Sequence, residues 1–347
     1  MPDYIMTVRA PEPDGSFGED VAQDVTFLSV PDGSTDFDTK TPTLISSAWY
    51  AQVIHAGSWA NANNEARGDI LFIVHGYNMS TQEVLQRHNL IKNDLSALGF
   101  KGVVVSFDWP TQNQALAYLP DRHAAKETAF RLVDEGIREL SDRQTPTCPI
   151  NIHILAHSTG AYVVREAFDD AEDTQLPDQC WTVSEIAFIA GDVSSDSMSG
   201  SDGIAEAIYR HCVRLTNYSN RYDAALGISN VKRLGVAPRV GRIGLPDDAP
   251  AKSLNIDCTD YYNQWSNNDA LQKADSPNGH YGLISHSWYF GNKVFASDLF
   301  QVLIGTDRVL PDTRHELTPP LTNRFVLQRP DAWPAPGVAA PAPAPGP

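Results

Sequence analysis

The stretch Ile150-Asn-Ile-His-Ile-Leu-Ala-His-Ser-Thr-Gly-Ala-Tyr-Val-Val-Arg-Glu-Ala-Phe168 decides the fold of this chain. It begins as an apolar, β-branched run, which predicts a buried parallel strand. After a turn of small residues it continues with Ala161, Val164 and Phe168 at helical spacing. A strand, a tight turn and a helix in direct succession predict an α/β domain.

Ser158 lies at the centre of that turn. A serine in this position is typical of a nucleophile elbow, in which a strained backbone lifts Oγ above the edge of the sheet. Strand and helix then pass so close that only Gly or Ala fits two residues to either side; here these residues are Ala156 and Gly160. The alternative interpretation is a Ser-Thr helix cap on an ordinary strand–helix unit.

Composition limits the class of protein. The 347 residues are enough for one large α/β domain or two ordinary ones, and 42% of them are hydrophobic, which is enough for a sizeable core. The formal net charge of −17 should repel phosphate backbones, so we expect no nucleic-acid partner. The histidines lack metal-ligand spacing and no phosphate-binding glycine loop is present, so we expect neither a metal nor a cofactor.

Cysteine usage and the N-terminus predict a cytoplasmic location. The four cysteines are spread singly along the chain, which fits reduced thiols better than a disulfide scaffold or a zinc site. The first residues lack the basic and apolar segments of a signal peptide, and no apolar run is long enough to span a bilayer. The sequence does not determine the oligomeric state. The cysteines are Cys148, Cys180, Cys212 and Cys258.

Strand and helix patterns alternate along the middle of the chain, which predicts a doubly wound, mostly parallel sheet. Aromatic and β-branched runs before residue 69 predict antiparallel strands at the N-terminal edge of that sheet. The expected strands are 4–8, 25–30, 48–55, 69–74, 103–107, 150–157, 185–190, 211–218 and 254–258, the last of the sheet. The expected helices are 80–98, 122–140, the segment after Ser158, 203–209 and 287–304.

The domain organisation follows from these patterns. We expect N-terminal strands and loops over 1–68, a core over 69–305, a C-terminal extension over 306–332 and a flexible Pro/Ala tail over 333–347. Long irregular stretches beside the predicted site are lid candidates, above all 224–252 and also the loop 112–120.

A nucleophilic serine needs a base, an acid to orient that base, and donors for the oxyanion. On a doubly wound sheet these groups gather at the carboxyl ends of the strands. His286, at the start of the last predicted helix, is the favoured base, and His280 is its competitor. Asp223 follows the penultimate strand and is the favoured acid. Asp192 follows the strand before it and is the alternative acid.

The remaining site residues come from the loop after strand 69–74 and from the turn itself. The backbone N–H groups of Tyr77 and Thr159 are the expected oxyanion donors, and Gly76 lets the backbone approach the substrate closely. His75 and His157 flank the site and precede any acid in the chain, so we expect them to shape the pocket. The complete expected substrate pocket is His75, Gly76, His157, Trp109 and Trp288.

Five spaced segments resemble a bacterial family of α/β hydrolases of unknown function. They are Ile73-Val-His-Gly-Tyr-Asn, Ser106-Phe-Asp-Trp-Pro, Ala156-His-Ser-Thr-Gly, Ala190-Gly-Asp-Val and Asn220-Arg-Tyr-Asp-Ala-Ala-Leu. The resemblance runs from about residue 69 to about residue 304, and the last segment matches closely but not identically. It implies the α/β-hydrolase fold and hydrolysis, with Ser158 as nucleophile, Asp223 or Asp192 as acid and His286 as base.

These observations predict a serine hydrolase that cleaves carboxylic esters through an acyl-enzyme. Its partner would be a small-molecule or lipid-like ester, because nothing in the sequence indicates a nucleic acid or an integral membrane segment. Two alternatives stay open: a catalytically silent binding protein with the same fold, and an amidase or acyltransferase that uses the same three residues.

Overall fold

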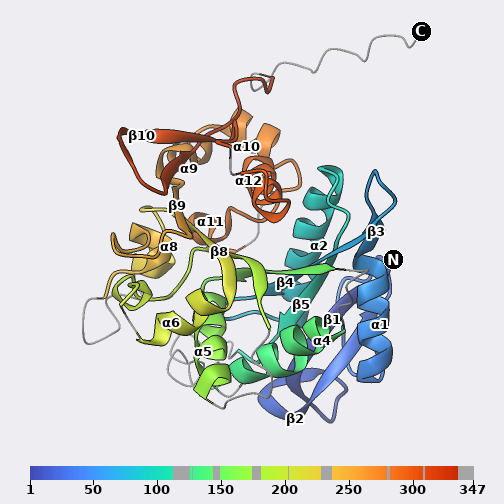
Figure 1. Cartoon of the computed structure of the whole chain (residues 1–347). Helices are drawn as coiled ribbons and strands as arrows, with labels where there is room; N and C mark the ends of the chain where they lie inside the picture. The colour runs from blue at the N-terminus through green and yellow to red at the C-terminus, as the bar shows by residue number, and fades with distance from the viewer. Residues whose placement is uncertain are drawn as a thin grey trace, which may run out of the picture.

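The computed structural model describes residues 1–111, 126, 128–143, 149–173, 181–201, 203–227, 237–279, 282–307 and 309–334. This part of the chain forms an 11-stranded sheet in the order β10-β11-β9-β8-β7-β6-β4-β5-β1-β2, with β3 paired to β4 (Figure 1). The pairs from β1 through β5, β4, β6, β7, β8 and β9 to β11 are parallel. The predicted doubly wound, mostly parallel sheet is therefore confirmed.

The strands are β1 (Asp3–Pro11), β2 (Phe17–Val30), β3 (Ser58–Ala60), β4 (Ala66–Val74), β5 (Val103–Asp108), β6 (Ile150–His157), β7 (Val183–Ile189), β8 (Cys212–Ser219), β9 (Ser253–Asp257), β10 (Arg314–Leu321) and β11 (Arg324–Leu327). Among the described helices are α1 (Ser46–Gly57), α2 (Thr81–Ala97), the π-helical η1 (Leu132–Arg138), α4 (Glu139–Asp142), α5 (Thr159–Asp173), the 3-10 turn η2 (Asp196–Met198) and α6 (Gly203–Arg210). They are followed by α8 (Val240–Ile243), α9 (Thr259–Ser266), α10 (Asp269–Asp275), α11 (Ile284–Ser287) and α12 (Lys293–Leu303).

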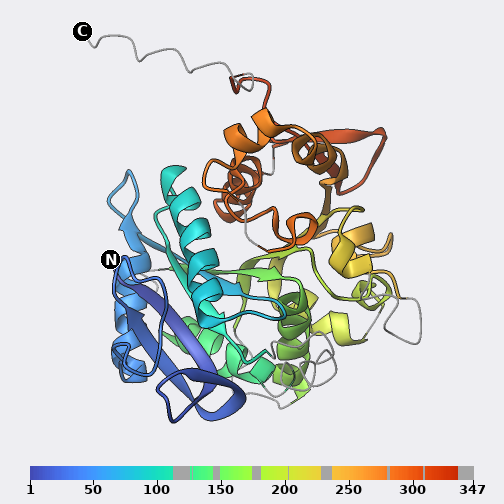
Figure 2. The same cartoon turned by 180° about the vertical axis from the view of Figure 1, so that it is seen from behind.

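Helices cover both faces of the sheet, as Figures 1 and 2 show from opposite sides. Strand β4 explains why, because its alternate side chains enter two different cores. Phe72 belongs to the core that includes side chains of α1, η1, α5 and α6. Leu71 and Ile73 belong to the core that includes side chains of α2, α9 and α12. A strand buried on both faces reads as a continuous apolar run, which is the pattern of residues 70–74.

The N-terminal region differs from its prediction in one element. Residues 48–55, expected as a strand, lie within helix α1. The reason is that the buried side chains Trp49, Tyr50 and Val53 are spaced for one helical face, where the Trp49 ring packs on Tyr4 of β1 and Phe27 of β2. At the sheet edge β2 is antiparallel to β1, as expected, whereas β1 itself runs parallel to β5.

The sheet continues beyond the strand that was predicted to be its last. Strand β11 pairs with β9 in parallel, and β10 pairs with β11 in antiparallel orientation, so the predicted extension 306–332 contributes two strands to the sheet. β11 has only 4 residues, and β10 contains Pro319 and Pro320. Within a sheet, proline is confined to edge strands, first residues of strands and bulges, and here the two prolines lie in an edge strand, between positions where the pairing register shifts. They hid this strand from the sequence pattern.

The helix predicted over 287–304 begins later, at Lys293 of α12, and Ser287 is instead the last residue of the separate short helix α11. Gly291 lies between them with φ of +80°, and the Asn292 side chain accepts the Phe295 N–H at the start of α12. His286 therefore lies inside the short helix α11 rather than in a loop before a long helix. The predicted lid loop 112–120 and most of the tail, 335–347, lie outside the described residues.

Candidate active site

Ser158 stands between β6 and α5 with a backbone φ of +55°, in the left-handed region that is uncommon for a non-glycine residue. Two hydrogen bonds to the end of β7 hold it there. Its N–H donates to Ile189 O at 3.1 Å, and its carbonyl accepts the Asp192 N–H at 2.9 Å. The strained turn is therefore maintained by the neighbouring strand, as expected for a serine whose Oγ is raised above a sheet edge.

Two glycines make room for this turn. A Cβ on Gly160 would lie 2.3 Å from Val74 O, and a Cβ on Gly76 would lie 2.7 Å from Ser158 Cβ. Both distances are far below van der Waals contact, so neither position accepts a side chain without movement of the backbone. The loop after β4 and the turn after β6 thus touch each other, and the sequence pattern of small residues has its physical reason here.

His286 and Asp223 form a close pair. His286 Nδ1 lies 2.7 Å from Asp223 Oδ2, and the Asp223 side chain is fully buried. The other carboxylate oxygen, Oδ1, accepts the Leu226 N–H at 2.9 Å, which orients the carboxylate. Helix α11 and the segment that carries Asp223 are joined again where the Ala224 N–H donates to Ser285 Oγ at 3.2 Å.

Asp192, the alternative acid, lies beside the same turn but faces another partner. It is 4% exposed, and its Oδ1 lies 3.1 Å from Nε of the buried Arg239. Its own N–H binds the Ser158 carbonyl. Of the two candidate acids, Asp223 is therefore the one that contacts His286, whereas Asp192 supports the backbone of the turn.

Ser158 and His286 are linked through His157. The rings of His157 and His286 lie with centroids 4.7 Å apart, and His157 Nε2 lies 3.0 Å from the His286 carbonyl oxygen. In the described part of the chain no hydrogen bond joins Ser158 Oγ to His286. Such bonds are often long in ligand-free sites and shorten when the substrate binds.

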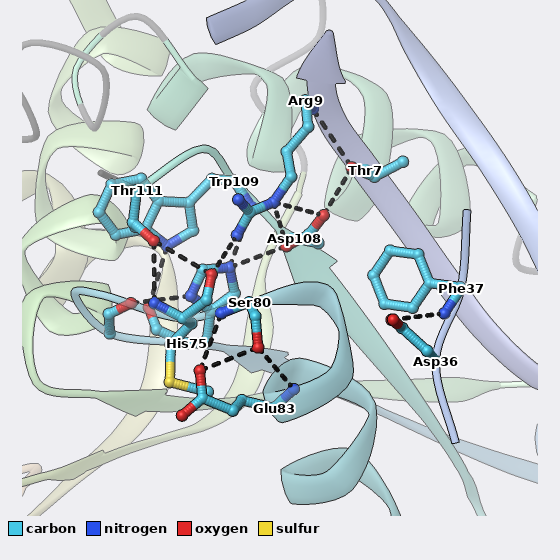
Figure 3. A network of polar contacts seen from close by, with 12 residues as sticks. Thr7, Arg9, Asp36, Phe37, His75, Ser80, Glu83, Asp108, Trp109 and Thr111 are labelled. Carbon is cyan, nitrogen blue, oxygen red and sulfur yellow. Dashed lines mark hydrogen bonds and ion pairs between the residues drawn. The ribbon is translucent and has the colours of Figure 1, made fainter. Parts of the chain in front are cut away.

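The loop that carries Gly76 and Tyr77 is held at its first residue, His75. His75 is 3% exposed, its ring stacks on Trp109 at 5.5 Å, and its carbonyl accepts the Trp109 indole N–H at 2.9 Å (Figure 3). His75 Nε2 lies 3.1 Å from both the Trp109 N–H and Asp108 Oδ1. Burial lowers the pKa of His75 despite the neighbouring carboxylate, so the ring is neutral at pH 7.

The other end of this loop is held by a buried ion pair, which Figure 3 shows reaching from β1. Arg9 Nε donates to both carboxylate oxygens of Asp108, at 2.8 and 3.0 Å, and Arg9 Nη2 donates to Met79 O at 2.8 Å. The Met79 N–H in turn donates to Thr111 Oγ1 at 3.0 Å, and Thr7 Oγ1 donates to Asp108 Oδ2 at 2.6 Å. Side chains of β1 and of the β5 end therefore determine where the Tyr77 backbone lies.

Two predicted pocket residues are instead core residues. Trp109 is fully buried against His75, and Trp288 is fully buried among Tyr261, Tyr262 and neighbouring aromatic rings. Neither indole offers a surface to a substrate, because tertiary packing has placed both rings in the interior. His75 and His157 are likewise buried, so they act on the site through their hydrogen bonds. The competing base, His280, lies outside the described residues.

Sequence reasoning missed Arg9, Arg87 and Asp108. Arg87 Nη1 lies 3.0 Å from His157 Nδ1, directly beside the candidate site. Arg87 and His88 occupy the buried stripe of α2 together with apolar residues such as Val84 and Ile91. Polar residues in the apolar stripe of an amphipathic helix are the signal that could have revealed them, because a charge is buried only where something compensates for it. Within the described residues, no cluster of three or more His, Cys, Asp or Glu side chains could hold a metal ion.

The geometry agrees with what the comparison of sequences finds. Residues 55–273, well over half of the chain, match the family Alpha/beta hydrolase of unknown function (DUF900), and the chain belongs to this family. The expected resemblance and the α/β-hydrolase fold are thereby confirmed. No curated protein sequence matches this chain significantly.

Several solved structures match this chain at low sequence identity and low TM-score. A protein from Lactobacillus plantarum WCFS1 described as a cell surface hydrolase is 14% identical, with 68% of this chain and 91% of that chain covered and a TM-score of 0.36. A cutinase-like protein from Cryptococcus sp. is 12% identical, with 68% and 93% covered and a TM-score of 0.31. An esterase/lipase from an uncultured bacterium is 13% identical, with 71% and 90% covered and a TM-score of 0.32. Likeness at this level carries no argument about what this chain acts on.

Proposed function

We propose that this chain is a serine hydrolase that cleaves carboxylic esters through an acyl-enzyme. Ser158 is the nucleophile, His286 the general base and Asp223 the acid that orients it. The observation that carries the proposal is the 2.7 Å contact between His286 Nδ1 and the buried Asp223, at the same sheet edge as the strained Ser158 turn. This is the arrangement that activates a serine hydroxyl.

In the proposed reaction, His286 Nε2 takes the Oγ proton as Ser158 Oγ attacks the ester carbonyl carbon. The carbonyl π bond opens, and the backbone N–H groups of Tyr77 and Thr159 hold the resulting oxyanion. As the intermediate collapses, the ester C–O bond breaks and His286 gives its proton to the departing alkoxide. Water then attacks the acyl-enzyme with His286 as base, which releases the carboxylic acid and restores Ser158.

An apolar, small-molecule or lipid-like ester is the proposed substrate class. Tyr222 and Leu283, which lie next to Asp223 and close to His286 in the chain, are 53% and 52% exposed. Exposed apolar side chains beside a polar reaction centre favour an acyl or alcohol group of similar character.

The lid over 224–252 stays a prediction: residues 237–252 are described and 228–236 are not. Near its middle the Gly241 N–H donates to Gly191 O at 3.0 Å.

We also propose a cytoplasmic location. Cys212 and Cys258 are buried free thiols, as is usual in a reducing compartment. Within the described residues no helix has the length and apolar character to cross a membrane.

The test is hydrolysis of p-nitrophenyl esters of increasing acyl length by wild type and Ser158→Ala, together with fluorophosphonate labelling of the folded protein. We expect turnover and labelling in wild type and neither in the variant, and the best acyl length should report the size of the acyl site. Turnover that survives in Ser158→Ala would contradict the serine mechanism. Wild type that neither turns over nor becomes labelled would favour a silent binding protein with this fold.

A further inference from the structure

Arg87 is a buried cation beside the proposed catalytic base. It lies in α2 and is 8% exposed. Within the described part of the chain no carboxylate forms an ion pair with its guanidinium; the carboxylate that acts on its pKa is Glu83, one turn earlier. The Glu83 carboxylate instead accepts hydrogen bonds from Ser80 in the capping box of α2. A buried charge with no counter-charge is costly, so its contacts need an explanation.

The first contact determines the tautomer of His157. A guanidinium only donates hydrogen bonds, so His157 Nδ1, 3.0 Å from Arg87 Nη1, must be the acceptor and carries no proton. The ring proton is then on Nε2, which lies 3.0 Å from the His286 carbonyl oxygen and donates to it. A continuous chain of hydrogen bonds therefore runs from Arg87 through His157 to the backbone of His286.

The second contact of Arg87 lies on the other flank of His286, at Ser287. Arg87 Nη2 donates to Ser287 Oγ at 3.3 Å, and the guanidinium lies over the Phe290 ring at 4.7 Å from its centroid. Ser287 closes α11, the 4-residue helix that carries His286. So short a helix has little stability of its own and depends on such external contacts for its position.

We propose that Arg87 is a positioning residue that holds α11, and with it the His286 imidazole, in place over Ser158. The inference rests on the proposed function, in which His286 is the base. Arg87 acts on both flanks of His286: through His157 on the carbonyl of residue 286, and directly on the side chain of residue 287. Its charge also keeps His157 neutral, so that the His157 Nε2–H remains a donor to His286 alone.

The electrostatics agree with this role. Burial, Arg87 and His286 together hold the pKa of His157 well below its ordinary value, with a smaller contribution from His75. Burial also lowers the pKa of Arg87 to about 10, so the guanidinium remains charged at pH 7 while the fold bears the cost of burying it. Among the described residues, the titratable side chains in contact with His286 are Asp223 and His157, with Arg87 behind His157.

The first experiment measures kcat and KM for wild type, Arg87→Met and Arg87→Lys on the ester that wild type hydrolyses fastest. We expect Arg87→Met to lower kcat about 10- to 100-fold, because a base displaced by a fraction of an ångström loses its alignment. KM should change by less than about threefold. Arg87→Lys keeps the charge but not the planar fork of donors, so it should restore only part of kcat.

Arg165→Met is the matched control. Arg165 is 7% exposed and bonds Ser197 and Glu166, neither of which has a role in the proposed mechanism. Its loss should leave kcat within about twofold of wild type. Two further variants test the His157 contact separately from the Ser287 contact. His157→Gln keeps a donor near the His286 carbonyl, and His157→Asn does not. His157→Gln should therefore retain more activity.

Nitrogen NMR of the histidine rings tests the hydrogen bonds from Arg87 through His157 to His286 without any assay of activity. We expect His157 in wild type to be the Nε2–H tautomer and to stay neutral through the range where an ordinary histidine titrates. In Arg87→Met we expect His157 to lose both the fixed Nε2–H tautomer and its resistance to protonation. An Nδ1–H tautomer in wild type, or an Arg87→Met variant with unchanged kcat, would overturn the proposal. If wild type shows no Ser158-dependent turnover, the proposed function fails. The tautomer measurement alone then still decides whether Arg87 holds His157 and the His286 backbone by hydrogen bonds.

Discussion

Arg9 and Arg87 are both buried, and both approach the sheet edge where Ser158 lies, yet their partners differ. Arg9 binds both oxygens of the buried Asp108, and together they hold the loop that carries Tyr77. Arg87 has a histidine and a hydroxyl as partners and holds the helix that carries His286. In the proposed mechanism Arg9 positions the loop that supplies an oxyanion donor, and Arg87 positions the helix that carries the general base.

The difference teaches how a buried charge can relate to stability. Removal of one member of a buried ion pair leaves the other charge unpaired, which costs the fold several kcal/mol. Removal of a buried cation that has no counter-charge leaves no such orphan, and the relief from desolvation offsets the lost hydrogen bonds. We call the contacts of Arg9 with Asp108 and Met79 the Arg9 network, and those of Arg87 with His157 and Ser287 the Arg87 network. We therefore expect the Arg9 network to matter most for stability and the Arg87 network to matter most for activity.

Arg9→Met should produce the largest loss of stability. Asp108 would remain buried without its cation, and the free energy of unfolding should fall by about 3–5 kcal/mol in urea titrations. The double variant Arg9→Met/Asp108→Leu is the control, since it removes both charges and should recover part of the loss. A single variant as stable as wild type would show that the ion pair does not hold β1 and β5 together.

Gly76→Ala should produce the largest loss of activity among variants of the loop. The added Cβ would lie 2.7 Å from Ser158 Cβ and 3.1 Å from His157 Nδ1, at the point where the two networks meet. We expect kcat to fall by about 100-fold, because the oxyanion donors move from their places. Gly136→Ala is the matched control, since its nearest neighbour is at an ordinary 3.4 Å. Wild-type kcat in Gly76→Ala would refute the close approach.

The pH dependence of stability should differ between the two networks. His75 and His157 have lowered pKa values in the fold, so protons bind the unfolded state better and stability falls as pH drops below about 6.5. Burial alone would raise the pKa of Asp108, but Arg9 and His75 outweigh it and lower the value. The Arg9 network therefore loses further stability below about pH 4. Urea unfolding of Asp108→Asn from acid to neutral pH should lack this second loss; a profile parallel to wild type would contradict it.

Arg87→Met should have the smallest effect on stability. The relief of a desolvated charge and the loss of a donor to His157 act in opposite directions, so we expect a change within about 1 kcal/mol. The measurement is the same urea titration at pH 7. A loss as large as that of Arg9→Met would erase the contrast between the two arginines and make Arg87 a structural residue.

The sequence predicted the elements that local patterns encode. The central strands, helix α2 with its Ser80 cap and the strand–turn–helix around Ser158 all agree with the structure, because periodicity and small residues act over a few positions. Helix α1 and strands β10 and β11 were missed. An aromatic, β-branched run and a Pro-containing edge strand both carry local preferences that tertiary packing overrode.

By itself the sequence determined the order of the candidate residues, the small residues around Ser158 and the membership of the α/β-hydrolase fold. Only the tertiary structure decided that Asp223 rather than Asp192 faces His286, and that Arg9 and Arg87 support the two sides of the site. The physical reason is distance along the chain. Arg9 and Asp108 are 99 residues apart and Arg87 and Ser287 are 200 apart, and no local preference specifies which distant partner a buried charge will meet.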